Sequence, residues 1–439
     1  MRRNRLSRVR ALVAVACLAT TALAAVGCRD LTSLQQSNPG ALDANGVFIP
    51  ANAVLLTNGV IADFECAFSR YVIGSGLFVD ELSDAIANPS NYDYDARRVT
   101  TNGPYGTVTC TSTSNQQPGI YTTLSTARAS GDTVAAKLRG WTDAEVPTGV
   151  SRAKLIGQAA AYTGYSIVLL GESMCSAAIN VGPELTPAQL FAEAKIRFDS
   201  AVVSATAAND ATTLNMALLG RARTLLDLGN AAAAGVDAAK IPSNFVLNMS
   251  TDGVNVRREN FSFIAINQNS WATVDASFRG LTINGAADPR VAVTNSGRAG
   301  TAAGTQVWTP DKYPALASAM PIARYAEAQL IVAEAKLAAN DLPGAIAAIN
   351  IVRASRPGVP AYDGTGQTAA QIKAQIIEDR RRELFLEGHR LGDLRRYNLP
   401  FTPTAGTAYT TGGGVYGTQT CLPLPDVERV NNPNIAKSP

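Results

Sequence analysis

The stretch Ala369–Tyr397, AAQIKAQIIEDRRRELFLEGHRLGDLRRY, carries the clearest pattern in the chain. Apolar residues recur through it every three or four positions, which predicts one long helix with a buried face. On such a helix Asp379, Glu383 and Glu387 lie four residues apart along one side. The arginines close enough to pair with these carboxylates are Arg380, Arg390 and Arg395. We therefore predict a structural ladder of ion pairs, with Asp379, Glu383, Glu387 and Arg390 as its members.

Glu383 and Glu387 also invite a catalytic hypothesis. Glycoside hydrolysis needs two carboxylates near one bond, and neighbouring helical side chains can approach the separation of about 5 Å that a retaining mechanism requires. A general acid needs a raised pKa, however, and paired arginines lower the pKa of a carboxyl group. The structural interpretation of the ladder is therefore favoured over a glycosidase.

His389 is the only histidine of the chain. A Ser-His-Asp or Cys-His arrangement would have to use it, and no second histidine can complete a common zinc site. A single histidine on a helix is more often a packing or surface residue. We expect no catalytic residue, no metal site and no cofactor.

Shorter helical runs precede this stretch. The pattern indicates helices at Ala153–Cys175, Thr186–Ala207, Leu214–Leu228, Ala231–Ala239 and Arg324–Ala339, with a further helix after the turn at 340–344. The last two units read as helix, short turn, helix, and they resemble tetratricopeptide repeats. Such repeats carry small residues where paired helices touch, and alanines supply them here at Ala333, Ala335, Ala345 and Ala348. The fold class is therefore mainly α with tetratricopeptide-like repeats, although an alanine-rich composition leaves their number open.

Long segments of another character separate the helical blocks. They lie at about 88–119, 242–320 and 401–439 and are rich in Gly, Asn, Thr and Ser. Excursions of this length in a compact domain usually have a function or are disordered. We expect them to form the ligand-facing part of the protein, while a helical scaffold occupies about 31–240 and 321–398.

Aromatic residues in these segments are the candidate ligand contacts. Sugars present apolar CH faces ringed by hydroxyl groups, so a sugar site combines exposed aromatic rings with polar side chains. Tyr92, Tyr94 and Tyr105 lie close to Asn91, Asp93, Asp95 and Arg97 and are the first candidates, and Trp271 is the second. The competing interpretation is that these rings are core or loop anchors.

The first 28 residues have the features of a lipoprotein leader. Five arginines, the last at Arg10, precede an uncharged apolar stretch that is short for a membrane span. Small residues then run up to Cys28, a pattern that resembles a lipobox. We expect residues 1–27 to be a signal peptide and Cys28 to carry the lipid, so that the protein is anchored to the membrane and does not span it.

Without residues 1–27 the chain has 33 basic and 35 acidic side chains. The basic surface expected of a nucleic-acid-binding protein is therefore absent, which excludes that class. Four cysteines remain after Cys28, namely Cys66, Cys110, Cys175 and Cys421, and an oxidising compartment allows three pairings. We favour Cys66 with Cys110 and Cys175 with Cys421, because the second pair would tie the chain end to the helical core. No two cysteines have the short spacing of a zinc knuckle.

Several ordered motifs together resemble one family. The pattern Asp-Arg-x-x-Glu-Leu-x-x-Glu-Gly-x-Arg-x-x-Asp-Leu-x-Arg at Asp379–Arg396 is similar to the C-terminal signature of SusD/RagB-like proteins, with Asp379 where Glu is usual. Upstream, the Arg-Tyr-Ala-Glu at Arg324–Glu327 matches that family's preceding repeat. Downstream, Leu-Pro-Leu-Pro at Leu422–Pro425 matches its closing segment.

The resemblance implies a single SusD-like domain over residues 28–439, built of about four tetratricopeptide-like helix pairs and a second, irregular lobe. It further implies a non-enzymatic lipoprotein of the outer membrane, facing the cell exterior. Such a protein would capture glycans, sometimes peptides, for a SusC-like TonB-dependent transporter. Two other functions remain open: a protein-interaction scaffold built on the repeats, and a lipid-anchored glycosidase that uses Glu383 and Glu387.

Overall fold

A computed structural model describes residues 44–110, 118–255 and 257–436. The chain divides into two compact units, residues 1–49 and 50–439. In the first unit the structure describes residues 44–49, with the short helix α2 (Ala44–Val47). The predicted signal peptide and Cys28 lie outside the described residues. In the described part of the chain, no helix is long and apolar enough to cross a membrane.

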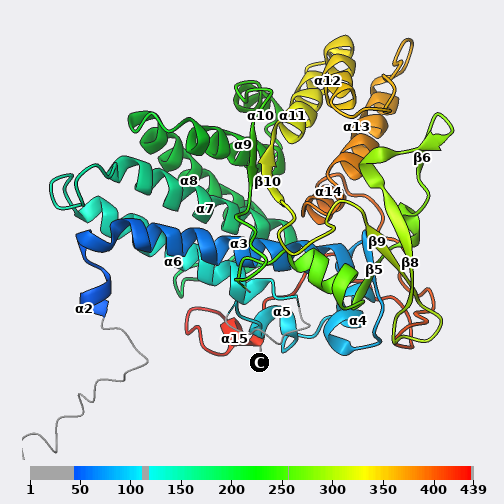
Figure 1. Cartoon of the computed structure of the whole chain (residues 1–439), viewed down its shortest axis with the longest axis horizontal. Coiled ribbons are helices and arrows are strands. Elements are labelled where there is room, and N and C mark those ends of the chain that lie inside the picture. Colours follow the sequence, from blue (N-terminus) through cyan, green and yellow to red (C-terminus); the bar gives the residue numbers. More distant parts are fainter. Residues whose placement is uncertain (1–43, 111–117, 256, 437–439) are drawn as a thin grey trace, which may run out of the picture. The chain divides into compact units, whose positions relative to one another are not determined.

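Helices dominate the second unit, and most of them form one continuous array (Figure 1). Each helix of the array packs against the next helix of the array, and α10 packs against α11 although a long loop-rich segment separates them in the sequence. In order, the array consists of α3 (Ala53–Phe78), α6 (Tyr121–Gly140), α7 (Arg152–Ser173), α8 (Pro187–Ala207), α9 (Ala211–Asp227), α10 (Ala231–Ala238), α11 (Tyr325–Ala338) and α12 (Leu342–Ala354). The helices predicted from the sequence are present, with ends that differ by a few residues.

Capping side chains explain where these helices begin. The Thr186 hydroxyl accepts a hydrogen bond from the Gln189 amide, and the Gln189 side chain accepts one from the Thr186 amide. Pro187 occupies the first helical position of α8. The carboxylates of Asp210 and Asp341 cap α9 and α12 in the same way. These local signals can be read from the sequence, which is why α8, α9 and α12 could be predicted, whereas α3 and α6, which have no side-chain cap, were not.

Close packing between the helices depends on small residues. At Gly220 of α9, an added Cβ would lie 2.4 Å from the ring of Phe198 on α8. Phe198 is fully buried, and its ring meets that of Tyr165 on α7 edge to face at 5.2 Å. The ring fits between α7 and α9 because position 220 has no side chain.

The long helix predicted over Ala369–Tyr397 is wrong. The structure has two helices, α13 (Ala369–Glu383) and α14 (Arg390–Arg396). Between them Leu386 and Gly388 adopt left-handed backbone angles, with φ of 54° and 72°. An L-residue rarely takes such a conformation, and at Leu386 it is held by long-range hydrogen bonds: its amide donates to Glu81 and its carbonyl accepts from the hydroxyl of Tyr313.

The loop-rich segments contain short helices and small antiparallel sheets of two strands. The pairs are β1 (Leu82–Asp84) with β5 (Ala272–Val274), β2 (Ala177–Ala178) with β3 (Glu184–Leu185), β4 (Val246–Asn248) with β10 (Pro321–Arg324), β6 (Thr282–Ile283) with β7 (Ala286–Ala287), and β8 (Val293–Ala299) with β9 (Gln306–Pro310). The short helices are η1 (Pro50–Asn52), α4 (Pro89–Asp95), α5 (Pro104–Thr107), η2 (Phe263–Gln268), η3 (Ala276–Phe278), η4 (Pro289–Val291) and α15 (Asp426–Arg429). The segment 88–119, expected to lack helical order, thus contains α4 and α5.

Two disulfides join Cys66 to Cys110 and Cys175 to Cys421, which are the two pairs that the sequence favoured. The second links residues 246 positions apart and ties the C-terminal segment to the end of α7. Next to it the Cys175 amide donates to the carbonyl of Leu422. The C-terminal loops are therefore anchored to the helical array.

Candidate ligand-binding site

The four aromatic residues predicted to contact ligand have different positions in the structure. Tyr92 lies on α4 and is partly exposed, as is Trp271 at the start of β5. Tyr94 and Tyr105 are fully buried, and their hydroxyls donate to the backbone carbonyls of Pro118 and Pro423. Their prediction as exposed ligand contacts is wrong, because both rings anchor loops. The Asn91 side chain donates to the carbonyl of Trp271 at 2.9 Å, so the two candidate regions meet.

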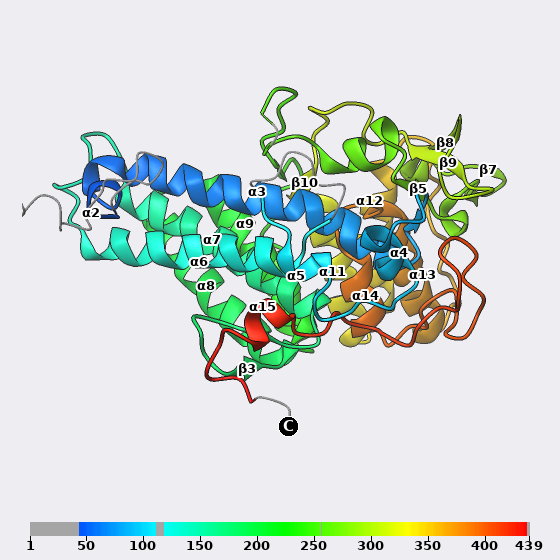
Figure 2. The ribbon, with the colours of Figure 1, turned by 90° about the horizontal axis from the view of Figure 1, so that it is seen from below.

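A second segment completes the surface around Tyr92. Residues 401–418 belong to the C-terminal loop-rich segment and lie beside α4 (Figure 2). Arg97 holds this loop, because its guanidinium donates to the carbonyls of Thr402 and Pro403. The Gly417 amide donates to the carbonyl of Ala96 at 2.7 Å, which fixes the other end of the loop.

Aromatic rings and guanidinium groups alternate across this junction. The Tyr409 ring lies 6.4 Å from that of Tyr92 and 5.1 Å from that of Tyr416, centre to centre. Arg98 lies over the Tyr409 ring at 5.6 Å, and Arg97 over the Tyr416 ring at 5.1 Å. We call this group the tyrosine–arginine cluster and define it as Tyr92, Arg97, Arg98, Phe401, Tyr409 and Tyr416.

The cluster has a buried base and an accessible surface. Arg97 and Tyr409 are each 2% exposed and form the base. Tyr92, Arg98, Phe401 and Tyr416 are partly exposed, with Asp93 beside them, and most of the loop around them is exposed. Glycine at position 412 leaves room for the Tyr92 ring, since an added Cβ would lie 2.9 Å from it and the ring would have to shift. The accessible part thus offers ring faces next to charged planar groups.

Buried carboxyl groups support the base of the cluster. Asp95 accepts hydrogen bonds from the Tyr409 hydroxyl and from the Asp84 amide. Burial raises the pKa of Asp95 to about 7, and it raises the pKa of Asp84 to about 6. Near neutral pH the Asp95 carboxyl is therefore present in both its protonated and its deprotonated form. It lies beneath the partly exposed rings.

The predicted ladder carboxylates occupy a different place, a buried junction between the helices. Asp379 pairs with Arg290 and Arg353, and Glu383 pairs with Arg324 and Arg356. Glu387 pairs with Arg324 and Lys312. We call Asp379, Glu383, Glu387 and these five basic partners the charged junction.

The partners predicted for the ladder are wrong. Arg380 pairs with Asp393 and Glu334, Arg390 pairs with Asp80 at 2.7 Å, and Arg395 donates to three backbone carbonyls at the end of α7. The reason is the break at Leu386: Glu387 leaves the helix, and the carboxylates of α13 turn towards other elements. The junction therefore joins β10, α12 and α13 to the loop-rich segment through η4 and Lys312, and it is not a ridge along one helix.

The geometry of the junction does not favour glycosidase chemistry. Arg324 donates to both Glu383 and Glu387, whose side chains are 0% and 2% exposed. Arg324 and Lys312 hold the pKa of Glu387 below its usual value despite the burial, so this carboxyl is a poor proton donor. A substrate would also have to displace these paired cations to reach either oxygen.

His389 is buried and faces other titratable groups. Its Nδ1 lies 3.9 Å from Glu327 Oε1. Burial, together with nearby arginines, lowers the pKa of His389 well below its usual value, so the imidazole is neutral and this contact is not a salt bridge. Burial raises the pKa of Glu327 to about 7. Among the described residues, no group of three or more His, Cys, Asp or Glu side chains could hold a metal ion.

Sequence reasoning missed Arg98, Phe401, Tyr409 and Tyr416. The only available signal was a segment with three aromatic residues and a run of three glycines at 412–414. Such a composition indicates a loop but does not say which other loop it contacts.

Comparison with known proteins identifies the fold. Residues 296–437 match the model of the SusD family. Over 88% of this chain and 97% of the other, the structure resembles a SusD superfamily protein from Bacteroides vulgatus, with a TM-score of 0.66 and 16% identity. A surface glycan-binding protein A from Bacteroides fluxus is similar over 88% of this chain and 99% of its own, with a TM-score of 0.63 and 14% identity.

A SusD-like carbohydrate binding protein from Bacteroides vulgatus is also similar, with a TM-score of 0.61 and 16% identity over 88% of this chain and 96% of the other. No curated protein sequence matches the chain. The matched C-terminal segment is thus SusD/RagB-family sequence, and the chain has the SusD-like fold, as the resemblance in the motifs predicted.

Proposed function

We propose that this SusD-like protein is a surface lipoprotein that captures glycans or oligosaccharides and delivers them to a TonB-dependent transporter of the outer membrane. It acts by reversible binding and not by chemical conversion. The observation that carries the proposal is the tyrosine–arginine cluster, in which partly exposed rings stand beside Arg98 and Asp93. In the proposal, residues 1–27 are a cleaved signal peptide and Cys28 bears the lipid.

The chemistry of the cluster suits a sugar. A pyranose ring has apolar CH faces that pack on tyrosine, while its hydroxyls take hydrogen bonds from guanidinium groups and give them to carboxylates. Tyr92 and Tyr416 flank the buried Tyr409, so two exposed rings lie within reach of one oligosaccharide. The buried base holds these rings in place before ligand arrives, which lowers the entropic cost of binding.

The fold supports the same proposal. The similar proteins from Bacteroides fluxus and Bacteroides vulgatus are described as glycan-binding and carbohydrate-binding. We interpret the helical array, from α3 to α12, as the tetratricopeptide-like scaffold of about four helix pairs that the sequence predicts over about 31–240 and 321–398. The loop-rich segments form the ligand-facing lobe in this interpretation, and the cluster belongs to them.

The two alternatives make different demands on the structure. A protein-interaction scaffold would bind through the repeat surface and would not need the cluster. A glycosidase would need Glu383 or Glu387 accessible to substrate, whereas both are buried against cations. Neither alternative accounts for the ordered, partly exposed rings at the end of the loop-rich segments.

Calorimetric titration of the protein with soluble polysaccharides and oligosaccharides tests the binding step. The double variant Tyr92→Ala/Tyr416→Ala should lose at least about tenfold in affinity, because two stacking contacts are removed. Tyr325→Ala is the matched control, since Tyr325 is also partly exposed but starts α11. Unchanged affinity in the double variant, or binding of peptides and of no glycan, would contradict the proposal.

Delivery and anchoring need separate experiments. Affinity purification of the full-length protein from detergent-solubilised membranes should bring down a TonB-dependent barrel protein. Cys28→Ala should release the protein from the membrane fraction. Recovery of a periplasmic or cytoplasmic partner in place of the barrel would support the scaffold hypothesis instead.

A further inference from the structure

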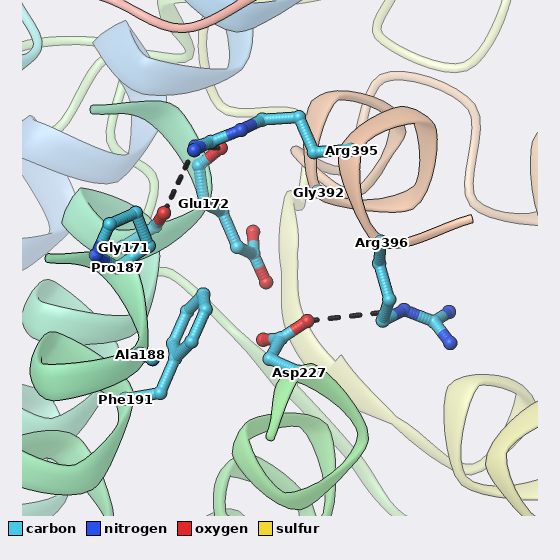
Figure 3. Close-up of a pocket in the computed structure, with 9 residues that line it drawn as sticks. All are labelled: Gly171, Glu172, Pro187, Ala188, Phe191, Asp227, Gly392, Arg395 and Arg396. Atoms are coloured by element: carbon cyan, nitrogen blue, oxygen red, sulfur yellow. Dashed lines mark hydrogen bonds and ion pairs between the residues drawn. The ribbon is translucent and has the colours of Figure 1, made fainter. Parts of the chain in front are cut away.

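A pocket lies where α7, α8 and α9 of the helical array meet α14 (Figure 3). Its volume is about 300 Å³, the lower end of the range for small-molecule sites. The ring of Phe191 forms one wall, and the carboxyl groups of Glu172 and Asp227 point into the same space. None of the residues of the tyrosine–arginine cluster lines it. The pocket is therefore separate from the site proposed above.

Most charges around this pocket are already compensated. Arg223 donates to both oxygens of Glu172 at 2.6 Å. Arg395 is occupied by the backbone carbonyls of Gly171, Glu172 and Met174. Arg396 pairs with Glu334 and Asp393 through its terminal nitrogens. These pairs are satisfied without a ligand.

Asp227 is compensated least, because its ion pair with Arg396 is long. Its side chain is 5% exposed, and its Oδ2 has no hydrogen-bond partner among the described residues. Its Oδ1 lies 3.9 Å from Nε of Arg396, too far for a direct hydrogen bond. Burial and the neighbouring Glu172 raise the pKa of the Asp227 carboxyl. A buried carboxyl group without a partner is costly, and a ligand that pairs with it relieves that cost.

The arrangement selects for uncharged ligands. The arginines and Glu172 are already paired within the protein, and burial favours the neutral form of the Asp227 carboxyl, so the pocket has no free charge for an ion. The Asp227 Oδ1 and the Arg396 Nε are an acceptor and a donor 3.9 Å apart, so a ligand hydroxyl beside the pair can reach both. Two neighbouring hydroxyl groups, one donating and one accepting, satisfy both at once. The Phe191 ring supplies an apolar wall for the CH groups of the same molecule.

We propose that this pocket binds one neutral sugar ring, through neighbouring hydroxyls on Asp227 and Arg396 and a CH face on Phe191. The site does not depend on the tyrosine–arginine cluster. It gives the helical array a ligand-binding role of its own, distinct from that of the loops. A volume of about 300 Å³ admits a single ring and not a chain.

The test uses ligand-observed and protein-observed NMR titrations of the full-length mature protein with glucose, galactose, mannose and N-acetylglucosamine, each up to tens of millimolar. At least one sugar should shift the resonances of Phe191 and Gly392, which line the pocket. Ala188→Trp fills the pocket mouth from an exposed position on α8 and should weaken this binding at least about tenfold. Ala192→Trp is the matched control, since Ala192 is exposed one turn further along α8 and does not line the pocket.

Charged analogues of glucose test whether the pocket prefers a neutral ligand. Glucosamine and glucuronate have the same ring but carry a charge, and both should bind more weakly than glucose. Tighter binding of either would overturn the assignment of a neutral ligand. Absence of any shift at the pocket with all four neutral sugars, or equal binding by Ala188→Trp and the wild type, would overturn the site itself. Tyr92→Ala/Tyr416→Ala should leave these shifts unchanged, so the outcome is independent of the first site.

Discussion

The charged junction and the tyrosine–arginine cluster are both rich in arginine, but they differ in how their groups are satisfied. In the junction Glu383 is 0% exposed and is shared by Arg324 and Arg356. In the cluster Arg98 lies over a ring, partly exposed, beside Asp93. The first region buries its carboxylates against paired cations, and the second leaves Arg98 and Asp93 partly accessible to solvent.

This difference separates structural from ligand-binding arginines. A buried carboxylate needs its cation to remain charged, so removing the cation destabilises the whole fold. A partly exposed arginine on a ring contributes little to stability and remains available to a ligand. The pattern of charge in the sequence is therefore a poor guide to the site, whereas exposure distinguishes the two regions.

The largest effect is expected in the junction. Arg324→Ala leaves Glu383 and Glu387 without their shared partner and should lower the free energy of unfolding by roughly 3–5 kcal/mol. Arg356→Ala is the control, because Arg356 also pairs with Glu383 but its side chain is 42% exposed, and it should cost about 1 kcal/mol or less. Urea denaturation followed by circular dichroism measures both. Equal losses in the two variants would show that the exposure of an arginine does not decide how much its ion pair contributes to stability.

A pH-dependent effect of nearly this size is expected at Glu327. Its pKa is about 7 in the folded protein, against an ordinary value of 4.5. Between these two values the folded protein holds a proton that the unfolded chain has released, so the free energy of unfolding falls as pH rises and levels off above pH 7 or so. Glu327→Gln cannot lose this proton.

The stability of Glu327→Gln relative to the wild type should therefore improve by up to about 3 kcal/mol between pH 4.5 and pH 8. Thermal unfolding at a series of pH values provides the measurement. A difference between variant and wild type that does not change with pH would show that Glu327 titrates normally in the fold.

In the cluster, Arg97→Ala should act mainly on the loop. It removes the hydrogen bonds to the carbonyls of Thr402 and Pro403 and should cost about 1–2 kcal/mol, with faster hydrogen exchange confined to residues 402–417. Arg139→Ala, at an exposed position of α6, should change neither quantity. Uniformly faster exchange throughout the protein would place Arg97 with the junction and not with the site.

The smallest effect on stability is expected for Gly412→Ala. The new methyl group would press on the Tyr92 ring and should shift unfolding by about 0.5 kcal/mol or less, while glycan affinity falls several-fold. Calorimetry with the ligand found for the wild type measures the affinity. Thr410→Ala is the control in the same loop, since Thr410 is exposed and lies outside the tyrosine–arginine cluster. An equal loss of affinity in both variants would contradict the role of the Tyr92 ring.

Sequence patterns alone determined most of the helical part of this protein. Helix signals such as Thr186-Pro187 and Asp210 are local, because a cap contacts an amide two or three residues away. The family motifs at Asp379–Arg396 likewise predicted the SusD-like fold that the comparisons confirm. Periodicity and capping involve neighbours in the chain, and these can be read directly from the sequence.

Only the tertiary structure decided which residues meet. Arg97 holds a carbonyl 305 positions away, and Arg324 reaches a carboxylate 59 positions away. Tyr92 and Tyr94 differ in exposure because α4 places them roughly 200° apart around its axis. The sequence analysis treated this segment as a loop and therefore did not predict the difference. The break at Leu386 follows from contacts with Glu81 and Tyr313, which overrule a local helical pattern. Long-range contacts of this kind determine the partners and exposure of side chains, and therefore the site.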